Sequence, residues 1–194
     1  NLPGPVLPQP VRLLKEPGKL RLIFIGRLHP IKNLHLVFEF MKGIDCEGEI
    51  TIVGNKEDET YFLKCEELAK ALPPTITVHF TGELQNKDVT AIINRHHLFI
   101  LPTSGENFGH AIFEAMAAGR PVLISDQTPW RNLVATGAGW DMPLLDDRAF
   151  KAAIRIAAGW DQQQFDYAAA AALKRAKDFA ADPVLLKGYH GLLN

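Results

Sequence analysis

The chain has 194 residues, of which 47% are hydrophobic and 22% are charged, as expected for one globular domain with a sizeable core. Its 21 Lys and Arg residues nearly balance 22 Asp and Glu residues, and the formal net charge of −1 argues against a nucleic-acid-binding protein. A phosphate-containing ligand would therefore have to be held by a few placed groups rather than by a general positive field.

Cysteines, histidines and apolar runs restrict the cellular setting. Cys46 and Cys65 belong to no CxxC motif, which favours two buried thiols in a reducing compartment. The 7 histidines show no metal-ligand spacing. No apolar run reaches the ~18 residues that a membrane span needs, and the first residues lack the layout of a signal peptide. We therefore expect a soluble, cytoplasmic domain without a metal site.

Residues 1–18 contain five prolines and two glycines. Such a stretch cannot nucleate a helix or join the centre of a sheet, so it is predicted to be an extended linker. Domains seldom begin with so long a proline-rich lead. We expect an interdomain linker over residues 1–18, one domain over residues 19–194, and a further domain on the N-terminal side of the linker.

Strand-like and helix-like segments alternate after the linker. The first predicted strand, LRLIFIG (20–26), is an apolar run closed by glycine, as expected for a strand buried on both faces. Further strands are predicted over 49–54, 76–82, 97–102, 121–125 and 138–141. Helices are predicted over 33–42, 57–72, 87–95, 108–119 and 130–135, and beyond residue 141. Thr128 is expected to cap the helix over 130–135, with Pro129 at its first position.

This alternation predicts an α/β fold with a doubly wound, mainly parallel sheet of about six strands and helices on both faces. Right-handed crossovers place every loop that follows a strand at one edge of the sheet. Ligands of such sheets bind at that edge. We therefore expect the ligand-binding residues to come from four converging loops, at 26–32, 54–57, 82–86 and 102–109.

The first of these loops reads GRLHPIKN (26–33) and carries two cations, Arg27 and Lys32, beside the start of a helix. Free N–H groups and the helix dipole at such a start favour negative charge, so the pair predicts an anion site. Solvated surface cations are the alternative. Their position at the ligand edge of the first strand favours the anion site.

The fourth loop and its helix form the stretch PTSGENFGHAIFEAMAAGRPVLIS (102–125). From Ala111 to Ala118 only Glu114 is polar, which predicts a buried helix in which a carboxylate is costly unless paired. The alternative is a Glu114 turned toward solvent or bonded to a neighbouring helix. Gly109 permits close approach of a ligand to the N–H groups near residues 109–111, and Glu106 lies in the loop itself.

Several common motifs are missing. The sequence has neither a GxGxxG motif after its first strand nor a Walker lysine motif, which makes dinucleotide and P-loop sites poor interpretations. It contains no GxSxG elbow, and no DxD-type pair stands at a strand end to hold a metal.

The two loops together resemble the C-terminal domain of GT-B glycosyltransferase family 4, the group 1 glycosyltransferases. That family carries a GRL-x-x-x-K loop and an E-x7-E element, here Glu106 to Glu114. The resemblance runs from about residue 20 to the end of the chain, and the combination in this order is specific. It implies the Rossmann-like donor-binding half of a retaining, metal-independent hexosyltransferase.

The resemblance also implies roles for individual residues. Arg27 and Lys32 would hold the donor diphosphate and stabilise its charge as it leaves. Glu106 would face the transferred sugar, and Glu114 would accept hydrogen bonds from the ribose hydroxyls. The remaining candidates, which would touch the donor or shape the base pocket, are Gly26, Gly54, Glu83, Leu84, Asn107, Phe108, Gly109, His110 and Ala111.

The implied partners are a nucleotide-diphosphate sugar as substrate and an absent N-terminal acceptor domain, onto which a last helix after Asp182 would cross back. No cofactor, metal or nucleic acid is expected, and peripheral membrane association of the full-length protein stays open. The chain departs from the family at His96, His97 and the Pro129–Arg131 segment, so donor identity stays open, as does the role of Trp130. The alternatives are a non-catalytic nucleotide-binding module and a GT-B relative such as a nucleotide-sugar epimerase or a phosphorylase.

Overall fold

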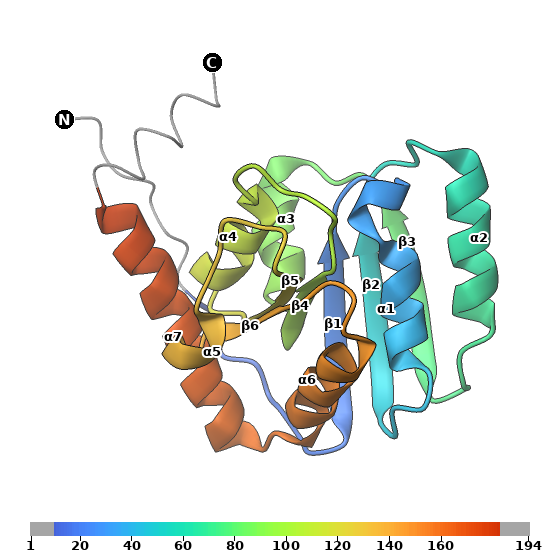
Figure 1. Cartoon of the computed structure of the whole chain (residues 1–194). Helices are drawn as coiled ribbons and strands as arrows, with labels where there is room; N and C mark the ends of the chain where they lie inside the picture. Colours follow the sequence, from blue (N-terminus) through green and yellow to red (C-terminus); the bar gives the residue numbers. More distant parts are fainter. Residues whose placement is uncertain (1–9, 183–194) are drawn as a thin grey trace.

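The computed structural model describes residues 10–182 and shows a six-stranded sheet between two layers of helices (Figure 1). All neighbouring strands pair in parallel, in the order β3-β2-β1-β4-β5-β6. The strands are β1 (Lys19–Ile25), β2 (Glu47–Val53), β3 (Ile76–Gly82), β4 (Leu98–Leu101), β5 (Val122–Ser125) and β6 (Gly139–Met142). This order is that of a Rossmann fold, with its switch point between β1 and β4. The predicted fold class is confirmed.

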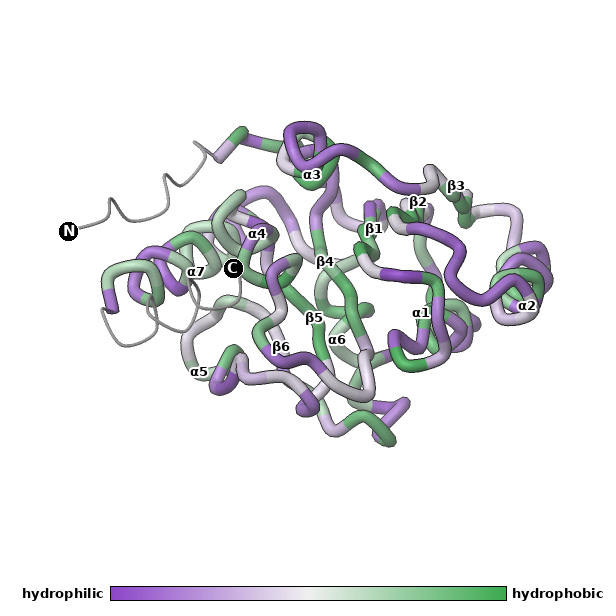
Figure 2. The backbone as a smooth tube through the Cα atoms, turned by 90° about the horizontal axis from the view of Figure 1, so that it is seen from above, coloured by the Kyte–Doolittle hydropathy of each residue, from purple (hydrophilic) through white to green (hydrophobic). Residues whose placement is uncertain are grey.

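Helices cover both faces of the sheet, with α1, α2 and α6 on one face and α3, α4 and α7 on the other (Figures 1 and 2). Their bounds are α1 (Leu34–Met41), α2 (Glu59–Lys70), α3 (Asn86–Ile93), α4 (His110–Ala117), α6 (Asp147–Gly159) and α7 (Gln162–Ala181). A 3-10 turn (Pro30–Lys32) precedes α1, and the short α5 (Leu133–Thr136) lies beside β6. Among residues 10–182, no helix combines the length and the apolar character that crossing a membrane requires.

Local chemistry explains where the longer helices begin. α2, α6 and α7 each start after an aspartate, respectively Asp58, Asp146 and Asp161, whose carboxylate accepts a hydrogen bond from a backbone N–H three residues ahead. The sheet is buried because apolar side chains of β1 face both helix layers; Leu22, Ile23 and Phe24 are 0% exposed. Both cysteines are buried and unpaired, as the sequence indicated.

The helix predicted over 130–135 is wrong in extent and in its cap. α5 begins only at Leu133, after Asn132 in a left-handed conformation with φ 59°. The Thr128 hydroxyl instead accepts a hydrogen bond from the Trp130 N–H in a tight turn. The cap of α5 comes from Asp141 of β6, whose carboxylate accepts the N–H groups of Asn132 and Leu133. Because this cap comes from another strand, the residues next to the helix start do not predict it.

Residues 10–18, here called the strap, form neither helix nor strand, but they are bonded to the domain. Arg120 donates to the Val11 carbonyl (2.7 Å), and the Nε2 atom of His97 donates to the Leu14 carbonyl (2.9 Å). The side chain of Lys15, 4% exposed, donates to carbonyls at the end of α6. A linker role for residues 1–18 stays a prediction; residues 1–9 and the last predicted helix lie outside the described residues.

Candidate functional site

A hollow of about 780 Å³ lies at the C-terminal edge of the sheet, at the switch point. Its walls are the loops that follow β1, β4 and β5. The polar residues that line it are Arg27, Lys32, Ser104, Glu106, Asn107, His110, Asp126, Gln127, Thr128 and Arg131. A second hollow of about 470 Å³, at the β6 edge, has no charged residue in its lining. A third hollow, of about 730 Å³, has charged residues such as Lys19, Arg21 and Glu49 in its lining, but it lies at the N-terminal ends of the strands. Because ligands of such sheets bind at the C-terminal ends, the switch-point hollow is the better candidate for a charged ligand.

Arg27 lies at the rim of this hollow and is paired with Glu57, a residue outside the predicted site. Its Nη1 atom donates to both carboxylate oxygens of Glu57, at 2.8 and 2.7 Å. The Arg27 side chain is 57% exposed, so solvent screens the pair. The predicted cation is present at the predicted edge, and its counter-ion is exchangeable.

Gly26 and Gly54 make the close approach of these two loops possible. A Cβ atom on Gly54, where φ is 154°, would lie 1.9 Å from the Gly26 carbonyl oxygen, so only glycine fits. The Leu28 N–H then donates to the Asn55 carbonyl across the same gap (2.9 Å). Neither glycine lines the hollow, and the structure gives both a packing role.

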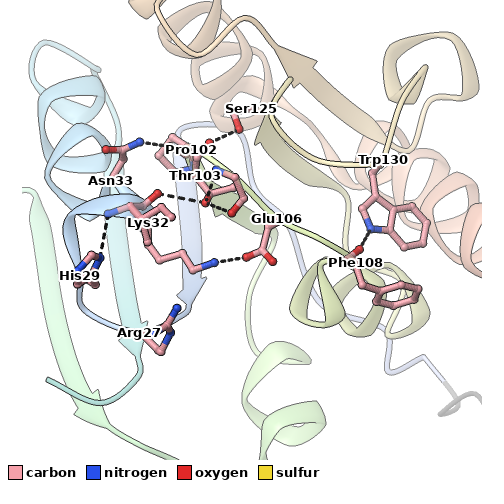
Figure 3. Close-up of polar contacts among 12 residues, drawn as sticks. Arg27, His29, Lys32, Asn33, Pro102, Thr103, Glu106, Phe108, Ser125 and Trp130 are labelled. Carbon is pink, nitrogen blue, oxygen red and sulfur yellow. Dashed lines mark hydrogen bonds and ion pairs between the residues drawn. The ribbon is translucent and has the colours of Figure 1, made fainter. Parts of the chain in front are cut away.

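Lys32 and Glu106 form an ion pair inside the hollow, with side chains only 12% and 19% exposed (Figure 3). Asn33 ties their loops together by donating to the Pro102 carbonyl (2.9 Å) and the Ser104 hydroxyl (2.8 Å). The backbone also joins the loops, since the Ser104 N–H donates to the Ile31 carbonyl. The sequence assigned these two side chains to different parts of one ligand; in the structure they contact each other.

Helix α4 opens onto the same hollow through Phe108, Gly109 and His110, with Asn107 beside them. Gly109 is the N-cap residue, with φ 77°, and a Cβ there would lie 2.8 Å from Ile112. Non-glycine residues are strained in this conformation. The N–H groups of a first turn have no partner inside their own helix, so this helix start offers hydrogen-bond donors beside Lys32.

Glu114 lies one turn further along α4 and does not line the hollow. The residue is exposed, and its side chain makes no hydrogen bond or ion pair within residues 10–182, which matches the solvent-facing alternative. Although the residue is exposed, nearby apolar atoms partly desolvate its carboxylate and raise its pKa. The ribose role stays a prediction. Ala111, three residues earlier, is half-buried against the core.

Glu83 and Leu84 follow β3, at the outer end of the sheet, and neither lines the hollow. Glu83 is exposed, whereas Leu84 packs partly against the core. The loop approaches its neighbour through a hydrogen bond from the Gly54 N–H to the Gly82 carbonyl (2.9 Å). Because two strands, β2 and β1, separate β3 from β4, a base pocket here stays a prediction.

The loop after β5 contributes to the site and was missing from the four loops expected to converge. Asp126, Gln127 and Arg131 line the hollow, and the Gln127 carbonyl accepts the Glu106 N–H (3.1 Å). Behind the lining, the indole of Trp130 donates to the Phe108 carbonyl (2.8 Å). The rule that all loops after parallel strands share one edge would have included this segment. Within residues 10–182, no three His, Cys, Asp or Glu side chains gather as a metal site would require.

Fold and site together define a Rossmann-like domain with cations and a helix start facing one hollow at the switch point. A family model described as glycosyl transferases group 1 matches residues 9–159. The chain belongs to that family, and the resemblance noted in its loops is confirmed.

Known proteins agree with this assignment. Sulfoquinovosyl transferase SQD2 of Arabidopsis thaliana is 31% identical over 108 residues, which cover 56% of this chain and 20% of that protein. Phosphatidyl-myo-inositol mannosyltransferase of Mycobacterium leprae is 27% identical over 156 residues, covering 77% of this chain and 40% of that protein. The matched segments therefore cover less than half of the length of each of these relatives.

Solved structures with the same fold include TarM. A variant of TarM from S. aureus, solved with fondaparinux, alpha-GlcNAc-glycerol and UDP, matches with a TM-score of 0.73 at 14% identity. The match covers 98% of this chain and 38% of that one. At this identity the likeness supports the fold of the domain.

Proposed function

We propose that this chain is the donor-binding half of a retaining glycosyltransferase. It binds a nucleotide-diphosphate sugar, and the whole protein transfers the hexose to an acceptor held by an additional N-terminal domain. The observation that carries the proposal is the hollow itself, where Arg27 and Lys32 face the start of α4 in a chain of this family. UDP in the related TarM structure supports a nucleoside diphosphate as the ligand.

Electrostatics explain how these groups would act. As the bond between sugar and diphosphate breaks, negative charge grows on the leaving phosphate oxygen. Fixed cations and helix N–H groups stabilise that charge most strongly in the transition state, which is what lowers a barrier. A diphosphate seated between Lys32 and Gly109 would take over the counter-ion role of Glu106 and release that carboxylate toward the sugar. In this scheme the reaction needs no metal ion.

The proposal places the enzyme in the cytoplasm. Cys46 and Cys65 are buried and unpaired, which suits a reducing compartment. A contact between the full-length protein and a membrane surface is compatible with this location.

Calorimetry with UDP-, GDP- and ADP-sugars, each with its free nucleoside as control, tests the proposal. We expect one of the nucleotide sugars to bind in the micromolar-to-millimolar range, with or without EDTA. The bare nucleosides should bind more weakly, because they lack the diphosphate that the cations hold. Failure of all three nucleotide sugars to bind would overturn the donor-site assignment, and binding that EDTA abolishes would overturn its metal independence.

A further inference from the structure

Trp130 is buried directly behind the start of α4. It is 2% exposed, and its Nε1–H donates to the Phe108 carbonyl at 2.8 Å (Figure 3). The same Nε1 atom lies 3.1 Å from the place where a Cβ on Gly109 would be. The indole therefore covers the peptide that joins Phe108 to Gly109.

The indole is held in place by helix α7. Its ring lies 4.7 Å from the Phe179 ring, and the Arg175 guanidinium lies 5.5 Å from the ring centroid. Phe113 of α4 packs on it in a stacked arrangement at 6.2 Å. Since α4, α7 and Phe108 in the loop after β4 all contact this ring, its position is fixed by packing as well as by its hydrogen bond.

The hydrogen bond fixes a direction. In a trans peptide the C=O and N–H groups point to opposite sides. Because the Phe108 carbonyl points at the buried indole, the N–H of Gly109 points away from it. Phe108 and Gly109 line the hollow whereas Trp130 does not, and the Gly109 N–H donates no hydrogen bond within residues 10–182. A free donor is thus aimed out of the protein core at the predicted phosphate position.

We infer that Trp130 is a positioning residue, whose indole N–H orients the Phe108–Gly109 peptide so that the Gly109 N–H binds a donor phosphate. This inference rests on the proposed function. It also gives a role to a residue at which the sequence departs from its family.

Trp130→Phe, which keeps an aromatic ring but removes the donor, is the direct test in the 194-residue chain. Loss of one net hydrogen bond of roughly 1 kcal/mol predicts about fivefold weaker binding of the preferred diphosphate among UDP, GDP and ADP. Binding of the matching nucleoside should not change. Trp140→Phe is the matched control, because Trp140 of β6 stacks on Trp160 and lies outside the switch-point hollow. This control variant should bind the diphosphate as tightly as wild type.

Hydrogen exchange supplies a readout that needs no ligand. In Trp130→Phe the amides of Ile112 and Phe113, which both donate to the Gly109 carbonyl, should exchange faster, while those of the sheet keep their wild-type rates. If the variant does not fold, 3-benzothienylalanine at position 130 keeps the ring shape with sulfur in place of the N–H. Wild-type diphosphate affinity, or unchanged exchange at Ile112 and Phe113, in either folded variant would overturn the inference. If wild type binds none of the three diphosphates, the proposed function fails, while exchange at Ile112 and Phe113 still decides whether Trp130 orients the peptide.

Discussion

At the scale of single residues, the two cations of the site differ in how firmly they are paired. Arg27 and Glu57 form an exposed pair, and such pairs contribute about 0–1 kcal/mol. Lys32 and Glu106 are largely shielded from water, so their attraction is screened less. A ligand phosphate would therefore displace Glu57 from Arg27 more easily than it displaces Glu106 from Lys32.

Replacing either cation should weaken binding of the nucleoside diphosphate and leave binding of the bare nucleoside unchanged. Arg27→Ala or Lys32→Ala is expected to weaken nucleoside-diphosphate binding by roughly 1.5–3 kcal/mol, the usual range for a hydrogen bond to a charged group. Titration calorimetry of the diphosphate and of the bare nucleoside measures both effects. An equal loss for both ligands would contradict the anion site.

Removing Glu57, the counter-ion of Arg27, should strengthen diphosphate binding. Glu57→Gln frees Arg27 from a competing carboxylate, so diphosphate affinity should rise about two- to fivefold at low salt, where exposed charges interact most. Glu59→Gln, two residues further along and also exposed, is the matched control and should leave affinity unchanged. A lower affinity for Glu57→Gln would mean that Glu57 orients Arg27 instead of competing with its ligand.

The two carboxylates of the E-x7-E element should separate in their effects. Glu114→Gln is expected to weaken every ligand that carries ribose, by roughly 1–2 kcal/mol for a lost charged acceptor. Glu106→Gln removes the counter-ion of Lys32, so it should leave nucleoside-diphosphate binding at least as tight as in wild type and impair recognition of the attached sugar. The roles of Glu106 and Glu114 are distinguished by measuring the affinity of each variant for a nucleoside diphosphate and for the corresponding nucleotide sugar. Unchanged nucleotide affinity in Glu114→Gln would remove its ribose role, in keeping with its place outside the hollow.

At the scale of elements, His97 connects the strap to the sheet. Its Nδ1 accepts the Arg21 N–H of β1 (2.9 Å) while its Nε2 donates to the Leu14 carbonyl, so only the neutral ring satisfies both bonds. Burial lowers the His97 pKa to about 4. His96, also buried, has its pKa lowered for the same reason.

These shifts predict a loss of stability in acid. Between pH 6.5 and about 4 the unfolded chain binds a proton at His97 that the folded chain does not, so stability falls as pH falls. The loss approaches about 3 kcal/mol, at ~1.4 kcal/mol per pKa unit. Urea unfolding across this range measures it. His97→Asn, which keeps an acceptor for Arg21, should flatten the curve; an unchanged slope would exclude His97 as its source.

The elements that the sequence predicted well are those with a local signal. Apolar runs closed by glycine or proline predicted the first four strands, and a proline marked the start of the fifth. The GRL-x-x-x-K loop placed Arg27 and Lys32 at the edge where the hollow lies. The start of α5 was mispredicted because its cap, Asp141, comes from β6. The partnership of Arg27 with Glu57 joins residues thirty positions apart on separate loops, and no sequence period encodes such a contact.

At the scale of the whole molecule, this chain should bind a donor without transferring its sugar. Transfer requires donor and acceptor in near-attack geometry, which is worth on the order of 7–11 kcal/mol at best. The proposed acceptor domain would supply the opposing wall and exclude water. The measurement compares this chain with the full-length protein, using one labelled donor and a crude acceptor extract. Robust transfer by this chain alone would show that it holds a complete active site.

The anchoring of the strap has a mechanical consequence. If all eighteen residues of the predicted linker were free, they would reach roughly 60 Å when extended. Residues 10–18 are held by Arg120, His97 and Lys15, so roughly 30 Å of that extended length is fixed to the domain and adds nothing to the reach of the proposed linker. A hinge toward the proposed acceptor domain would therefore lie on the N-terminal side of the strap.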